Sequence, residues 1–141
     1  MERELVIHRS ESLLLGEYIA FLGIEHKPLR VPSGITDLHL DKPEGSEVVE
    51  MKRASRGRFV REALAQLLDY APHTPGPAAR LTALFPTLPD EQCLALLHRY
   101  GIDCAYRTSP NSFACVDAPG DVRAAMTPFW RDEWKSSEED G

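Results

Sequence analysis

The sequence of 141 residues contains only three cysteines, Cys93, Cys104 and Cys115, and no Cys-x-x-Cys arrangement. No histidine stands at a ligand-like spacing from them, so the pattern argues against a zinc site. Three cysteines are also too few for a disulfide framework. We therefore expect reduced thiols that act as small buried hydrophobes.

Long apolar runs are missing as well. No stretch approaches the roughly 20 apolar residues that a helix needs to cross a bilayer. The opening residues, MERELVIHRSES, lack the basic-then-apolar order of an export signal. The expectation is a cytoplasmic protein with no membrane partner.

The length suits one domain with a single hydrophobic core. An apolar fraction of 43% and a charged fraction of 27% are usual for a globular protein. We place this single domain at residues 1–131. Residues 132–141 hold five acids and one lysine, and we expect this acidic tail to be disordered.

Positive charge is scarce overall but concentrated in one place. The net charge of −6 argues against indiscriminate binding to nucleic acid. Residues 52–61, however, contain five basic residues and no acid. This local basic stretch says more about function than the global charge does.

Hydrophobic periodicity and turn residues predict an α/β fold. The predicted order is α-β-β-β-α-β, followed by an α-β-β-α extension. The predicted helices span residues 11–22, 57–71, 89–100 and 121–134. The predicted strands span residues 27–31, 35–40, 47–52, 81–85, 103–108 and 112–117. In the simplest register of the last hairpin, Tyr106 faces Phe113 and Cys104 faces Cys115.

Two predicted strands carry an unusual set of charges. Glu50 and Lys52 are two residues apart, so both side chains leave the same face of their strand. Asp37 lies on the preceding strand across a short turn, where it can stand beside Glu50. Two neighbouring carboxylates repel each other, and a divalent cation relieves this repulsion. All-oxygen ligation of this kind suits Mg²⁺ or Mn²⁺.

The first predicted helix adds an independent indication. A projection at 100° per residue puts Glu11 at the centre of its apolar face. An unpaired charge is costly there, and a metal cluster would supply a partner. The alternative is that Glu11 lies at the frayed start of the helix and is simply solvated.

The second predicted helix carries a stripe formed by Phe59, Ala63, Gln66 and Tyr70, at spacings of four, three and four. Gln66 is the only amide in this stripe and points toward the strands. A functional role and a satisfied amide at the edge of the core are both open at this point.

Taken together, these residues resemble the PD-(D/E)XK nuclease superfamily. Thr36-Asp37 and Val49-Glu50-Met51-Lys52 stand where this superfamily has its two motifs. Gln66-x-x-x-Tyr70 is similar to the QxxxY motif of the RecB-like branch. The resemblance covers about residues 8 to 72 and implies a restriction-endonuclease-like core, αβββαβ, with a mixed central sheet flanked by helices.

The resemblance also implies a metal-dependent deoxyribonuclease. Asp37 and Glu50 would hold Mg²⁺ (or Mn²⁺), with the backbone carbonyl of Met51 and with Glu11 directly or through water. Lys52, one of only four lysines, would orient the attacking water or stabilise the transition state.

The remaining roles concern DNA, the implied partner. Gln66 and Tyr70 would line the site, and Arg53 and Arg56 would contact phosphates without reading sequence. Arg58 and Arg61 fall on the polar side of the predicted helix and are equally well explained as solvated charges.

Two other classes of protein compete with an active nuclease. One is an inactive nuclease-like domain that binds nucleic acid or protein, since −6 is a low charge for a nuclease that acts without a protein partner or a second copy. The other is a structural α/β domain whose acids and lysine form a salt-bridge network. Residues 73–141 carry no motif that separates these classes.

Overall fold

The structure, a computed structural model, describes residues 13–23, 30–32 and 34–132. It has an α/β architecture with a five-stranded mixed sheet in the order β3-β4-β5-β6-β7 and helices on both faces. A separate two-stranded sheet pairs β1 (Arg30–Val31) with β2 (Gly34–Ile35). The central strands are β3 (Leu38–Lys42), β4 (Gly45–Met51), β5 (Ala78–Phe85), β6 (Asp103–Ser109) and β7 (Ser112–Val116).

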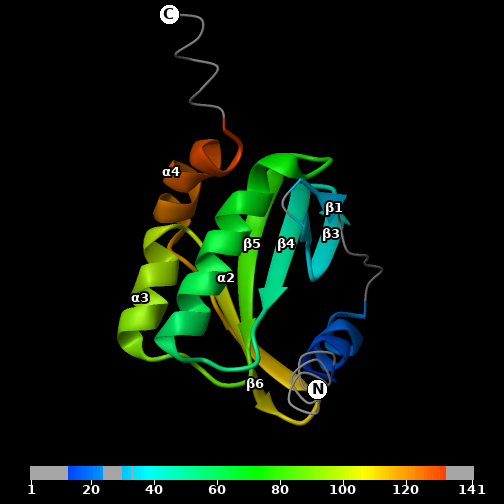
Figure 1. The fold of residues 1–141 in the computed structure, drawn as a ribbon, viewed down its shortest axis with the longest axis vertical. Helices are drawn as coiled ribbons and strands as arrows, with labels where there is room; N and C mark the ends of the chain where they lie inside the picture. Colours follow the sequence, from blue (N-terminus) through cyan, green and yellow to red (C-terminus); the bar gives the residue numbers. More distant parts are fainter. Residues whose placement is uncertain (1–12, 24–29, 33, 133–141) are drawn as a thin grey trace, which may run out of the picture.

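The helices are α2 (Gly57–Tyr70), α3 (Glu91–Arg99) and α4 (Gly120–Trp130), with a short 3₁₀ turn, η1 (Ala71–His73). A further helix, called here the N-terminal helix, is described over residues 13–22. Figure 1 shows α2 lying along β4 and β5, with α3 and α4 beside it. No helix in the described ranges is long and apolar enough to span a bilayer.

Strand directions follow from the connections. A tight turn joins β3 to β4 antiparallel, and Gly45, with φ of 135°, is required there because a Cβ would lie 2.6 Å from the Pro77 carbonyl oxygen. Helices α2 and α3 are crossovers, so β4, β5 and β6 run parallel. A hairpin returns the chain to β7 antiparallel.

The sheet separates two apolar clusters. One cluster lies between the sheet and α2, α3 and α4, and contains Val48, Val60, Leu67, Phe85 and Trp130. The other lies between the sheet and the N-terminal helix, and contains Leu14, Tyr18, Leu38, Val49 and Met51. Burial on both faces explains the nearly continuous apolar sequences of β4 and β5.

Local signals account for the helix boundaries. Helix α2 begins after Arg56, whose backbone is extended, and Pro72 follows its end. In α3, Asp90 caps the first turn because its Oδ1 accepts the Cys93 N–H at 2.8 Å. Both helices lie where the sequence predicts them, to within two residues.

Other expectations need correction. The predicted strand at residues 35–40 is broken at Thr36–Asp37, so Asp37 lies in a bend just before β3. The predicted hairpin register is wrong: Arg107 pairs with Phe113, and Ala105 pairs with Cys115. The error comes from the turn: Ser109 pairs with Ser112 across Pro110–Asn111, two positions away from the predicted register, and the shift between Arg107 and Ser109 reduces this difference to one.

The cysteines are free thiols. Cys104 is buried and Cys93 is half-buried, but Cys115 is exposed, so the expectation of burial fails for this one. The acidic tail falls almost wholly outside the described residues.

Candidate active site

The structure places Asp37 and Glu50 side by side. The β3–β4 register pairs Leu38 with Val49, and one further step sets Asp37 opposite Glu50. The Asp37 backbone N–H donates to Glu50 Oε1 at 3.0 Å, and the Met51 N–H donates to Asp37 Oδ2 at 2.9 Å. Each carboxyl group is therefore fixed by the backbone of the other strand.

Burial makes this pair of acids electrostatically unusual. Glu50 is 3% exposed, and its pKa is raised to about 9. Loss of solvation is the largest cause, followed by the negative charge of Asp37 and a side-chain hydrogen bond to it; Lys52 opposes the rise. Without a cation, Glu50 therefore keeps its proton to a much higher pH than an exposed glutamate does.

Lys52 follows directly after β4. Its backbone N–H donates to the Leu84 carbonyl at 2.9 Å, which fixes the main chain at this point. Its ammonium group lies 3.6 Å from Glu62 Oε2, and the lysine side chain is 13% exposed. The sequence analysis missed Glu62, although Glu62, Gln66 and Tyr70 share the four-residue spacing of one helix face.

Gln66 and Tyr70 are one turn apart on α2, and Tyr70 lies close enough to the acids to feel their charge. The Gln66 Oε1 atom is buried and has no hydrogen-bond partner among the described residues. The pKa of Tyr70 is raised, first by burial and then by the negative charges of Glu50 and Asp37. Its hydroxyl lies beside Gly34, 3.6 Å from where a Cβ would stand. An unpartnered buried acceptor such as Gln66 Oε1 is a place for a bound water or ligand.

The predicted phosphate contacts are exposed arginines at the start of α2. Arg56 occupies the N-cap position without a side-chain cap. The Arg53 guanidinium lies 5.0 Å from the centroid of the Phe59 ring. Arg58, which is also exposed, lies over the same ring, with its guanidinium 4.7 Å from the centroid.

The residues around Asp37 and Glu50 offer oxygen ligands for one metal ion. Glu11 falls outside the described residues, and within the described ranges no three His, Cys, Asp or Glu side chains form a metal-binding group. Mg²⁺ is often held by only one or two carboxylates, with waters and substrate phosphate completing its shell. Asp37 and Glu50 fit this pattern. The Met51 side chain packs on the sheet face covered by the N-terminal helix, so only the backbone carbonyl of Met51 could bind the metal.

Glu50→Gln should stabilise the metal-free protein increasingly as pH rises. Folding raises the pKa of Glu50 from its ordinary 4.5 to about 9, so the folded chain binds the extra proton between these values. The wild type should therefore lose stability across this window, by at most about 1.4 kcal/mol per pH unit for one proton. Melting temperatures in EDTA between pH 5 and 9 measure the effect. The exposed Glu44→Gln is the matched control and should leave the wild-type pH profile unchanged.

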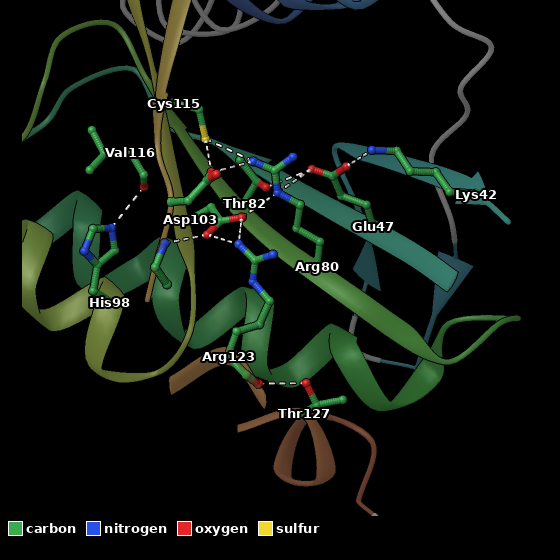
Figure 2. A network of polar contacts seen from close by, with 12 residues as sticks. Lys42, Glu47, Arg80, Thr82, His98, Asp103, Cys115, Val116, Arg123 and Thr127 are labelled. Atoms are coloured by element: carbon green, nitrogen blue, oxygen red, sulfur yellow. Dashed lines mark hydrogen bonds and ion pairs between the residues drawn. The ribbon is translucent and has the colours of Figure 1, made fainter. Parts of the chain in front are cut away.

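A network of polar side chains, which the sequence analysis did not find, surrounds Asp103 (Figure 2). Asp103 lies on the sheet face that the N-terminal helix covers, the same face as Ala105. Asp103, at 0% exposure, accepts hydrogen bonds from Arg80, Arg123 and the Ala118 N–H. Glu47 accepts from Lys42 at 2.6 Å and from Thr82 at 2.8 Å. This buried charge network joins β3, β4, β5, β6 and α4.

The charges within the network offset one another. Arg80 also contacts Asp117 at 3.0 Å, and the cavity beside it, about 230 Å³, is lined by both acids and bases. The network therefore has the character of an internal cross-link between strands.

Comparisons of the chain with models of protein families, with curated proteins and with solved structures find no match. The function of the protein is therefore inferred from the geometry of Asp37, Glu50 and Lys52.

Proposed function

We propose that the protein is a metal-dependent nuclease that hydrolyses DNA phosphodiester bonds. The observation that carries this proposal is the pairing of Asp37 with Glu50 at the end of β4, with Lys52 two residues further on. A buried glutamate beside a second, half-buried acid is costly to fold in its charged form, and binding of a cation offsets that cost.

The arrangement of elements supports a restriction-endonuclease-like core. The N-terminal helix and α2 lie on opposite faces of the sheet, and α2 connects two parallel strands, β4 and β5. Asp37 lies in a bend just before β3, and Glu50 is the second-last residue of β4. The rigid strands therefore hold both acids in place near the end of β4.

Asp37 and Glu50 would hold Mg²⁺ or Mn²⁺, together with the Met51 carbonyl and Glu11. When bound, the cation supplies a Lewis acid that lowers the pKa of water and offsets negative charge on the phosphate. Since the raised pKa keeps a proton on Glu50, binding of the cation must release it. The affinity for metal should therefore increase with pH up to about 9.

Other side chains would act on the water and on the phosphate. Lys52 would orient the attacking water or stabilise the negative charge that builds up on the phosphoryl oxygens. The unpartnered Gln66 Oε1 would accept a proton of a bound water, and Tyr70 would close that side of the site. Arg53 and Arg56 would hold neighbouring phosphates.

A second candidate, an inactive nuclease-like domain that binds nucleic acid or protein, is favoured by one observation. Within the described ranges, no three His, Cys, Asp or Glu side chains form a metal-binding group. In this case the basic residues would still bind phosphate, but no bond would be cut. A cleavage assay separates the two candidates.

The experiment is incubation of the protein with supercoiled and with linear DNA, in Mg²⁺, in Mn²⁺ or in EDTA. The nuclease proposal predicts cleavage that needs the cation and stops in EDTA. Nicked or linearised plasmid would indicate endonuclease action, and shortening of the linear DNA alone would indicate exonuclease action. Intact DNA under all conditions, with DNA bound, would favour the inactive domain.

Asp37→Asn should abolish cleavage together with the rise in melting temperature that Mn²⁺ causes in the wild type. An amide is a weaker ligand for a hard cation than a carboxylate is. The same change removes the repulsion between the two acids, so the melting temperature without metal should be equal or higher. Thermal melting with and without Mn²⁺ measures both effects. A variant that still melts higher in Mn²⁺ would remove Asp37 from the metal site.

A further inference from the structure

We propose that Arg53 and Arg58, which both contact the ring of Phe59, form a phosphate-binding site for a nucleic-acid strand next to Lys52. The proposal rests on the proposed function for the identity of the strand. It adds Arg58 as a binding residue and Phe59 as a positioning residue, neither of which the motifs assign. Arg53 follows Lys52 directly in the chain, so the phosphate it holds would neighbour the one that is cut.

The first argument is the geometry of the ring. The two guanidinium groups lie 5.0 and 4.7 Å from the ring centroid of Phe59, so cation–π contacts hold both arginines near one point. Phe59 itself is 7% exposed and packs into the core. A fixed ring therefore restricts two long side chains that would otherwise sample many rotamers. Restriction before binding reduces the entropy that binding must cost.

The second argument is the charge. The two guanidinium groups lie within about 10 Å of each other and repel. Within the described ranges, neither has a carboxylate closer than 4 Å. Other arginines, by contrast, have oxygen partners within the protein: Arg80, Arg107, Arg123 and Arg131. A concentration of unneutralised positive charge at a rigid point fits a polyanion.

The start of α2 adds to the positive electrostatic potential around Arg53 and Arg58. Its first turn contains no acid, and its N-cap, Arg56, makes no side-chain cap. Gly57 leaves room for a third arginine, since a Cβ there would lie 3.1 Å from Arg61 Nη1. The helix dipole and the free N–H groups of a first turn favour an anion as well. The arginines carry the proposal, and the helix end reinforces it.

The test is binding of a fluorescein-labelled DNA oligonucleotide in EDTA, where no cleavage takes place, at several salt concentrations. Arg53→Ala and Arg58→Ala should each weaken binding by about tenfold and lower the slope of log Kd against log salt by about one. Arg99→Ala, which removes the same charge from the exposed last turn of α3, should change neither. Phe59→Leu keeps every charge and should still weaken binding, with melting temperatures used to select temperatures at which all variants are folded.

Two outcomes would overturn the proposal. One is that Arg58→Ala, like Arg99→Ala, leaves the Kd and its salt dependence unchanged. The other is that the wild type does not bind DNA. An unchanged Kd in Phe59→Leu would overturn the role of the ring. The proposed function fails separately. A wild type that binds through these arginines but never cuts DNA in Mg²⁺ or Mn²⁺ keeps the phosphate site and loses the nuclease.

Discussion

Lys52→Ala should lower DNA cleavage by at least about 10²–10³-fold, which is below detection in an ordinary assay, while binding of DNA and of metal stays nearly intact. The reason is that binding and the chemical step would depend on different residues. Asp37 and Glu50 would hold the cation and arginines would hold the strand, whereas Lys52 acts where charge develops in the transition state. Single-turnover cleavage, DNA binding and Mn²⁺-dependent melting measure the three properties separately.

The matched control for Lys52→Ala is Glu62→Gln. It removes the same 3.6 Å ion pair and leaves the lysine in place. If loss of the ion pair alone disturbed the site, both variants would lose cleavage to the same extent. We expect Glu62→Gln to retain most of the activity. Equal rates for wild type and Lys52→Ala, under conditions where the wild type clearly cuts, would remove Lys52 from the mechanism.

Asp103→Ala should destabilise the fold by about 3–5 kcal/mol, although it lies on the other face of the sheet from the site. The Asp103 side chain is fully buried and takes hydrogen bonds from both Arg80 and Arg123. Its loss leaves two arginines facing each other without the acid between them. The Ala118 N–H loses its acceptor too. Urea denaturation gives the free energy of unfolding.

Asp117→Ala is the comparison for this variant. Asp117 also pairs with Arg80, at 3.0 Å, but its side chain is 63% exposed. Water screens such a pair, so the expected loss is about 0–1 kcal/mol. Similar losses in the two variants would show that the buried network is not a specific cross-link. The metal-dependent melting shift should persist in both variants, because neither residue touches the acids.

Much of the site was predictable because it depends on short-range rules. The tight turn between β3 and β4 fixes which residues face each other, and this rule alone brings Asp37 to Glu50. The four-residue spacing of a helix places Gln66 above Tyr70. Proline and capping signals fixed α2 and α3 for the same local reason.

The wrong expectations concern the exact position of a turn and contacts between residues far apart in the chain. The position of the two-residue turn in the β6–β7 hairpin leaves no clear signal, and it changed every expected pair there. The buried network joins Arg80 to Asp103, 23 residues away, through the order of strands in the sheet. No local pattern encodes such a contact. The pairing of Arg53 and Arg58 on Phe59 similarly needed side-chain positions.

The central sheet has its strands in the order in which they occur along the chain. During synthesis, each strand therefore finds its neighbour already made, and no later strand has to insert between two earlier ones. Every described residue assigned here to chemistry or to phosphate binding precedes η1. On the ribosome, the acids and the lysine can be brought together by β3, β4 and α2 before α4 is complete. The contacts of Asp103 with Ala118 and Arg123 can form only afterwards, and they stabilise a sheet in which the site residues are already in place.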